Sequence, residues 1–185
     1  MQMREMDREP PGSLDCCKPG GAGASRSSPG ARLSDITFRR AVRADLPEIV
    51  ALLADDAVNG HREKTGEPLQ PGYVKAFEAI TSDPNNVLIV GEIDGAPVAT
   101  AQVTFIPNLT QQGGMRAIVE GVRVSSTVRS QGIGEKLMAY MTALARERGC
   151  VYVQLTTSKA RIDAHRFYDR IGFVHSHLGF KRDLK

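Results

Sequence analysis

The sequence predicts a mixed α/β fold, and three observations support this prediction. Apolar and polar residues alternate in several short runs, which is typical of strands with one buried face. Other segments carry apolar residues at helical spacing. Asp94-Gly95 lies between two strand-like runs, and this dipeptide is typical of a tight hairpin turn. The expected order of elements is βαα, βββ, α, β, α, ββ.

The composition is that of an ordinary soluble protein. The 185 residues are 41% hydrophobic and 24% charged, with a formal net charge of +3, and this length indicates one domain. The basic residues are scattered, which argues against a nucleic-acid-binding face. No apolar run is long enough to span a membrane. Cys16 and Cys17 are adjacent, which suits neither a disulfide nor a Cys-x-x-Cys metal site, so the cysteines indicate a reducing, cytoplasmic compartment and no bound metal.

Residues 1–35 differ in composition from the rest of the chain. They are rich in proline, glycine and serine, as in Lys18-Pro19-Gly20-Gly21. Such a segment buries too little apolar surface to offset its chain entropy, so disorder is predicted. The alternative is an added segment without a role, from an upstream start. The folded domain is expected to span residues 36–185.

A strand and two helices are expected at the start of this domain. Residues 36–39 alternate as a strand does. Asp45-Leu46-Pro47-Glu48 combines a capping residue, a first-turn proline and a capping-box glutamate, which predicts the start of a helix. Residues 59–72 are polar and interrupted by glycine and proline, which indicates a loop. Residues 73–80 predict a second, short helix.

Three strands are expected next. Residues 87–90 and 98–106 flank the Asp94-Gly95 turn, and residues 107–114 indicate a polar loop. The third strand spans residues 118–124. Its alternation predicts one face made of Ile118, Glu120, Val122 and Val124.

The periodicity becomes helical at Gly132. An apolar stripe begins at Ile133, and Gly149 is well placed to end the helix. The remaining predicted elements are a strand at 151–155, a helix at 161–170 and two closing strands at 172–174 and 180–184.

The segment from Val122 to Gly134 carries the chemistry. A strand leads into the turn Arg129-Ser130-Gln131-Gly132-Ile133-Gly134, and a long helix follows. The amino terminus of a helix has unpaired N–H groups and positive partial charge. Glycines let the backbone approach an oxyanion, and arginine adds a forked cation that suits phosphate. The turn therefore predicts a diphosphate site.

Two common phosphate motifs do not fit this turn. A Walker loop needs a glycine where the chain has Arg129, and Lys-Ser/Thr where it has Glu135-Lys136. A dinucleotide fingerprint needs a third glycine where the chain has Leu137. The ligand is therefore expected to be a diphosphate of another class.

In the residues of this turn and in a second motif, the chain resembles the GNAT superfamily of acetyl-CoA-dependent N-acetyltransferases. The family signature, Arg/Gln-x-x-Gly-x-Gly/Ala between a strand and a helix, is matched by Arg129, Gly132 and Gly134. A second family motif is matched further on by Ala164, Phe167-Tyr168 and Gly172-Phe173. Two motifs at the right separation make the resemblance specific, and it covers residues 36–184.

The resemblance implies the fold, the acyl donor and the acceptor class. The sheet would be mixed and mostly antiparallel, with a splayed parallel strand pair and helices on both faces. Acetyl-CoA would lie in the splay, and no metal is implied. The acceptor would be a primary amine of a small molecule or peptide, with no nucleic acid or membrane as partner, and a homodimer stays open. The implied donor-binding residues are Val122, Arg123, Val124, Arg129, Ser130, Gln131, Gly132, Ile133 and Gly134.

The resemblance also implies two proton-transfer residues. Glu120 matches the acidic residue just ahead of the donor-binding strand end and would take the proton of the amine. Tyr168 matches the tyrosine that protonates the departing thiolate. The structural alternatives are an ion pair of Glu120 with Arg116 or Arg123, and a core position for Tyr168.

The chain departs from the family pattern at Arg161, where many relatives carry an asparagine that contacts the pantetheine arm. A contact from Arg161 or Lys159 to a CoA phosphate is the hypothesis that replaces it. The acids Asp55, Asp56, Glu63 and Glu67 are candidates for attracting a cationic amine. The alternative to an enzyme is a non-catalytic acyl-CoA binder or sensor, in which Glu120 and Tyr168 are dispensable.

Overall fold

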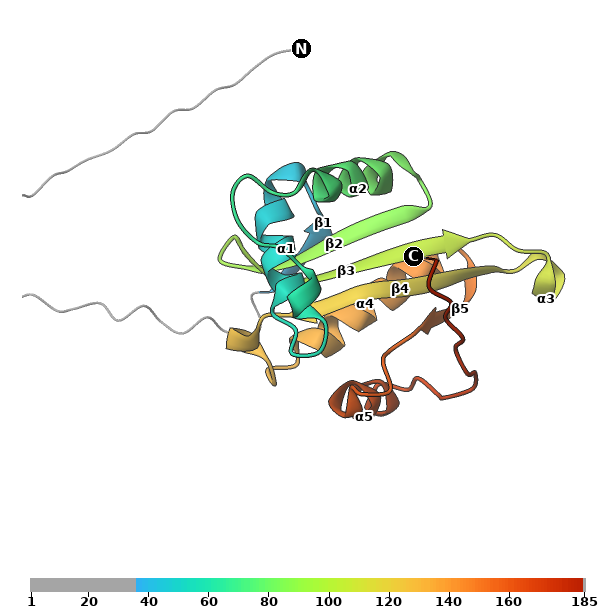
Figure 1. Cartoon of the computed structure of the whole chain (residues 1–185). Helices are drawn as coiled ribbons and strands as arrows, with labels where there is room; N and C mark the ends of the chain where they lie inside the picture. The colour runs from blue at the N-terminus through green and yellow to red at the C-terminus, as the bar shows by residue number, and fades with distance from the viewer. Residues whose placement is uncertain (1–35, 185) are drawn as a thin grey trace, which may run out of the picture. The chain divides into compact units, whose positions relative to one another are not determined.

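A computed structural model describes residues 36–184 (Figure 1). The segment expected to be disordered, residues 1–35, lies outside the described residues. Five strands form one sheet in the order β1-β2-β3-β4-β5. Neighbouring strands are antiparallel except β4 and β5, which are parallel. The predicted mixed, mostly antiparallel sheet is therefore confirmed. The strands are β1 (Thr37–Arg40), β2 (Asn86–Ile93), β3 (Ala96–Ile106), β4 (Met115–Val124) and β5 (Cys150–Leu155).

The helices also follow the prediction in order and position. A short turn of helix, α3, lies inside the loop expected at 107–114. The bounds are α1 (Leu46–Ala54), α2 (Pro71–Ser82), α3 (Thr110–Gly113), α4 (Ile133–Glu147) and α5 (Ile162–Arg170). Between β2 and β3, Asp94 and Gly95 have φ angles of 51° and 77°, as a hairpin turn of two left-handed residues requires.

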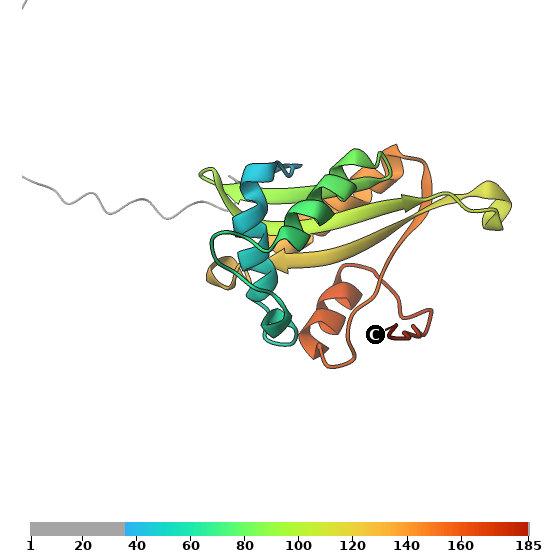
Figure 2. The same ribbon diagram turned by 45° about the horizontal axis from the view of Figure 1, so that its top comes forward.

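Helices cover both faces of the sheet, as Figures 1 and 2 show. On one face, Val90 of β2 packs with Ile49 of α1 and Phe77 of α2. On the other, Ile89 of β2 packs with Met141 of α4. Because successive side chains of a strand point to opposite faces, one strand serves both layers. This arrangement leaves the carboxyl ends of β4 and β5 as the place where the sheet opens.

The start of α1 differs from the predicted capping box. The carboxylate of Asp45 accepts hydrogen bonds at 2.7 and 2.9 Å from Arg39 of β1, and one at 2.7 Å from the N–H of Val42. It makes no side-chain cap, because its backbone is already helical and turns the carboxylate away from the first turn of α1. Arg39 holds the pKa of this buried carboxyl below its usual value. Asp45 therefore ties β1 to the helix layer.

The two closing strands predicted at 172–174 and 180–184 are wrong. Residues 173–184 form no strand, and their apolar side chains after the partly buried Phe173 are exposed. The exposed fraction is 79% for Val174 and 95% for Phe180. Alternation predicts a strand only where one face can be buried, and this segment has no such surface against it.

Candidate active site

A bulge interrupts β4 at Gly121. Thr100 of β3 pairs with Arg123, and Gln102 pairs with Glu120, so the two residues Gly121 and Val122 lie opposite one residue of β3. Gly121 has a φ of 61°, which glycine adopts without strain. An extra residue of this kind shifts the alternation of a strand by one position.

The bulge overturns the predicted face of β4. Val122 and Val124 pack in the same cluster as Val119, on the α4 side of the sheet. Glu120 pairs with Gln102, and Gln102 lies on the α1 and α2 side of the sheet. The side chain of Glu120 is exposed to solvent. The expectation that Glu120 shares a face with Val122 and Val124 is therefore wrong. Sequence alternation missed the bulge because it assumes an unbroken strand.

A large cavity of about 730 Å³ lies between the end of β4, the turn before α4 and helix α5. The parallel ladder runs from Met115 and Cys150 to Val119 and Leu155, and β4 continues beyond it to Val124. At the predicted donor-binding residues, β4 thus has no strand partner on the β5 side, although the carbonyls of Val122 and Val124 accept hydrogen bonds from Arg123 and Arg129. The cavity brings together most of the predicted site residues, namely Val122, Arg123, Val124, Arg129, Ser130, Gly132, Ile133, Gly134, Arg161 and Tyr168. Gln131 and Glu120 are not among its lining residues.

The turn before α4 is shaped to receive an anion. Gly132 is the N-cap residue and has a φ of 77°, and Ser130 has a φ of 63°. Residues 132–135 border the cavity, so the unpaired N–H groups of the first turn of α4 lie along it. A Cβ added at Gly134 would lie only 3.3 Å from the ring of Phe167 on α5. Gly134 therefore lets the ring of Phe167 approach the first turn of α4 closely.

Arg129 borders the cavity, but most of its donors hold the turn in place. Its Nε donates to the carbonyl of Val124 at 3.0 Å, and its Nη2 donates to the carbonyl of Asp55 at 2.6 Å. The same nitrogen lies 3.2 Å from the carboxylate of Asp55, which also accepts the N–H of Ser126 at 2.6 Å. Arg129 thus joins the end of β4 to the end of α1, and the helix N–H groups are left as the main contacts for an anion.

Asp56 forms a buried link between three parts of the site. Its carboxylate is 3% exposed and pairs with Arg123 of β4 at 2.8 Å and with Arg161 at the start of α5. The hydrogen bond from Arg161 lowers the pKa of Asp56 to about 2, with help from the N–H of Val58 and the charge of Arg123. Arg161, expected at a CoA phosphate, is therefore engaged by Asp56 in this structure.

These contacts change the expected role of the acids. Asp55 and Asp56 were candidates for attracting a cationic amine, but both carboxylates already face arginines. Glu63 accepts a hydrogen bond from the hydroxyl of Tyr73 at 2.8 Å. Arg123 keeps one buried nitrogen, Nε, without a hydrogen-bond partner in the described part of the chain. The cavity thus presents more positive than negative charge to a ligand.

Tyr168 lies on α5 and borders the cavity beside Phe167 and Phe173. Its ring centre is 5.1 Å from that of Phe167 and 5.8 Å from that of Phe173, both in edge-to-face geometry. Burial raises the pKa of the Tyr168 hydroxyl, against the opposing charges of Arg123 and Arg161. Tyr168 therefore has both features that were considered: its ring packs against other aromatic rings, and the residue borders the cavity.

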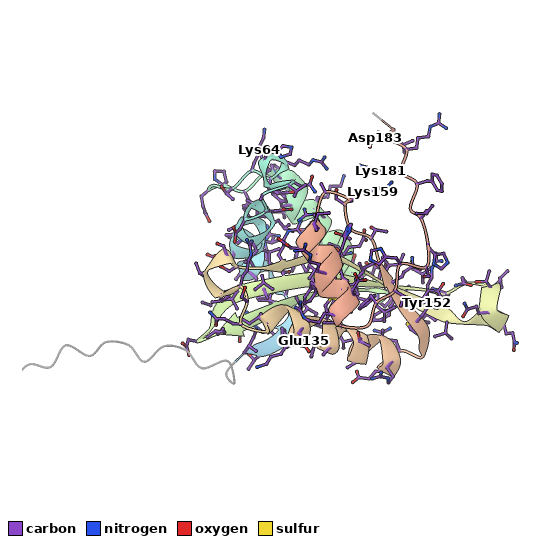
Figure 3. The ribbon with its side chains drawn as sticks, turned by 90° about the horizontal axis from the view of Figure 1, so that it is seen from below. Lys64, Glu135, Tyr152, Lys159, Lys181 and Asp183 are labelled. Atoms are coloured by element: carbon purple, nitrogen blue, oxygen red, sulfur yellow. The ribbon has the colours of Figure 1, made fainter. Side chains whose placement is uncertain are left out.

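The side-chain view adds two charged residues near the cavity. Figure 3 shows Glu135 in the first turn of α4 and Lys159 on the loop before α5.

Between residues 36 and 184, no three His, Cys, Asp or Glu side chains gather as metal ligands would. In the same residues, no helix has the length and apolar character needed to cross a bilayer.

Residues 49–173 match the acetyltransferase (GNAT) family. The chain belongs to this family. The match includes β4, the turn at Gly132, α4 and the Tyr168 motif, so the resemblance inferred from two motifs is confirmed, as is the family fold.

Known proteins extend this result. A crystal structure described as a transcriptional regulator from Bacillus halodurans is 47% identical, covers 80% of this chain and 99% of its own, and has a TM-score of 0.79. A protein from Clostridium acetobutylicum, crystallised with acetyl-CoA, is 19% identical over 80% of this chain and 96% of its own, with a TM-score of 0.62. The aminoalkylphosphonate N-acetyltransferase of Salmonella typhimurium is 38% identical over 66 residues, or 36% of this chain. The chain spans about half the length of that relative and of another curated one, 43% and 56%.

Sequence reasoning missed two features of this family member's site. One is the link made by Asp56, which no local pattern signals because its partners lie far along the chain. The other is the bulge at Gly121. A glycine inside a strand pattern often marks a bulge, so that signal was present in the sequence.

Proposed function

We propose that this protein transfers an acetyl group from acetyl-CoA to a primary amine of a small molecule or peptide. The observation that carries the proposal is the cavity of about 730 Å³ at the end of β4, bordered by the first turn of α4 and by Tyr168. The name of the Salmonella relative supports a small amine as acceptor, and the Clostridium structure supports acetyl-CoA as donor.

The residues at the cavity fit such a donor. The N–H groups at the start of α4 would hold the diphosphate, because they are unpaired and carry the positive end of the helix dipole. Gly132, where an added Cβ would meet nothing within 4 Å, leaves room for its oxygens. Beyond its ladder with β5, the backbone of β4 at Val122 and Val124 would hydrogen-bond the pantetheine arm through its N–H groups. Arg123 would add positive charge beside it.

The proposed reaction is a direct attack. The amine nitrogen attacks the thioester carbon, the C–S bond breaks, and the thiolate leaves with a proton. An N–H near Val122 would stabilise the developing oxyanion. Tyr168 would supply the proton, because its raised pKa keeps the hydroxyl protonated at neutral pH. Glu120 would take the proton of the amine through water, since it is exposed to solvent next to the bulge, on the α1 and α2 side of the sheet.

The test is release of free CoA thiol from acetyl-CoA in the presence of a panel of primary amines. Tyr168→Phe is expected to lower kcat about a hundredfold while acetyl-CoA still raises Tm. Tyr152→Phe, on β5 and away from the cavity lining, is the matched control. Glu120→Gln should also lower kcat about a hundredfold, with Glu147→Gln at the exposed end of α4 as control. Full activity in both site variants would contradict these roles.

A second candidate function is a non-catalytic acyl-CoA sensor. It is favoured by one observation, that the relative with 47% identity is described as a transcriptional regulator. A sensor would gain stability from acetyl-CoA but release no thiol with any amine. Tyr168→Phe would then leave the Tm shift caused by acetyl-CoA unchanged, and neither protein would release thiol.

A further inference from the structure

A second, smaller cavity of about 150 Å³ lies under α1 and α2, against the sheet. Its walls are mainly apolar side chains from three elements: Ile49 and Leu53 of α1, Phe77 and Ile80 of α2, and Leu88 of β2. Ala76 of α2 lines it too and is exposed. Protein interiors are packed with few voids, and an unfilled apolar cavity lowers stability. A cavity kept at this place is therefore suited to receive a ligand group.

The polar groups on its walls are already engaged. The hydroxyl of Thr100 donates to the carbonyl of Ile89 at 2.9 Å, and the amide of Gln102 donates to Asn86 at 3.0 Å. The hydroxyl of Tyr73 donates to Glu63 and accepts the N–H of Lys64 at 3.0 Å. A polar group placed here would lose water without gaining a partner, which is costly. The cavity therefore selects apolar groups.

The bulge in β4 brings this cavity next to the donor site. Gly121 lines the small cavity, and the next residue, Val122, lines the large one. Consecutive Cα atoms are about 3.8 Å apart, so the linings of the two cavities come within one residue of each other at this point. A Cβ added at Gly121 would meet nothing within 4 Å, so the position is open. Glu120, the proposed base, directly precedes this peptide.

We infer that the small cavity holds an apolar group of the acceptor, so the preferred acceptor is a primary amine joined by a short link to a phenyl-sized or short alkyl group. An apolar cavity of roughly 150 Å³ is large enough to bind benzene. With its apolar group in this cavity, the amine would lie beside Glu120 and face the thioester near Val122. The inference rests on the proposed acetyl transfer and names its acceptor class.

The experiment measures kcat/KM for n-alkylamines from propylamine to hexylamine, with phenethylamine and ethanolamine, at saturating acetyl-CoA. Each added methylene that enters the cavity is expected to raise kcat/KM about fourfold until the cavity is full. Ala76→Phe should abolish this gain, because it adds a ring at the exposed wall of the cavity. Ala79→Phe, on the same helix and away from the lining, should keep it. Ile80→Ala should move the optimum to a longer chain.

The outcomes separate the inference from the proposed function. Thiol release with a flat response along the alkyl series would overturn the inference and leave acetyl transfer standing. If no amine causes thiol release, the binding of hexylamine is measured from the shifts of methyl NMR signals of the protein. Shifts that are lost in Ala76→Phe and kept in Ala79→Phe support the cavity assignment. The absence of any shift overturns it. A preference for hexanoyl-CoA that Ala76→Phe removes would assign the cavity to the acyl chain and overturn the inference.

Discussion

The two cavities, which are lined by consecutive residues of the β4 bulge, are built in different ways. The large one takes its character from backbone, namely the turn at Gly132, the first turn of α4 and the end of β4 beyond its ladder with β5. The small one takes its character from side chains of α1, α2 and the sheet, which meet only after folding. Local backbone geometry is encoded by short motifs, whereas the shape of an apolar cavity depends on tertiary packing. The turn of the proposed donor site could therefore be predicted from the sequence, and the small cavity could not.

The two cavities also treat charge differently. Around the large cavity, Asp55 and Asp56 are paired with arginines, so these residues join α1, β4 and α5. Around the small cavity, the neutral polar groups are hydrogen-bonded within the protein. Substitutions at the large cavity should change acetyl-CoA binding or stability. Substitutions at the small cavity should change acceptor preference or packing stability and leave acetyl-CoA binding unchanged.

The largest effect is expected from Gly134→Asp. The added side chain would crowd Phe167 and place negative charge at the diphosphate site, so acetyl-CoA affinity should fall at least about a hundredfold. The measurement is calorimetric titration with acetyl-CoA. Gly72→Asp is the matched control, since it puts the same acid at the second residue of α2, away from the cavity. Unchanged affinity in Gly134→Asp would place the diphosphate elsewhere.

Asp56→Asn should have the next largest effect, on stability. The variant leaves Arg123 and Arg161 facing each other without an anion, and the free energy of unfolding should fall by about 2 kcal/mol. Chemical denaturation measures this loss. Asp94→Asn, in the exposed hairpin, should change stability little. Equal stability of the two variants would mean that the link is not needed to hold α5.

The pairing of Asp56 with Arg123 and Arg161 also predicts that stability depends on pH. The pKa of Asp56 is about 2 in the fold, below its ordinary value of 3.8. Its contribution to stability is therefore present above about pH 4 and lost as the pH falls toward 2. The difference in unfolding free energy between the protein and its Asp56→Asn variant should shrink by about 1 kcal/mol over this window. A constant difference would show that Asp56 titrates normally.

The smallest effect is expected from Thr100→Val in the wall of the small cavity. The loss of the hydrogen bond to Ile89 should lower the free energy of unfolding by about 1 kcal/mol. The Tm shift caused by acetyl-CoA should stay the same, because Thr100 does not line the large cavity. Thr142→Val removes a similar bond on α4 and serves as control. A changed acetyl-CoA shift in Thr100→Val alone would mean that the two cavities are coupled.

Much of the fold could be predicted because its signals are local. Asp94-Gly95 specifies the hairpin through left-handed residues, and Gly132 specifies the start of α4 in the same way. Other features depend on partners distant in sequence. Asp45 has the residue type of a helix cap, but Arg39 of β1 takes its carboxylate instead. Residues 180–184 alternate like a strand but find no surface to cover.

For the site, the sequence by itself determined the family, the order of elements and the turn that borders the large cavity. These follow from spacings within short segments, where glycine, arginine and helix periodicity act through neighbouring backbone. The tertiary structure alone decided which face Glu120 takes, which anion Arg161 meets and where the small cavity lies. Each of these depends on side chains separated by tens of residues along the chain, whose distances are fixed only when the sheet and helices pack.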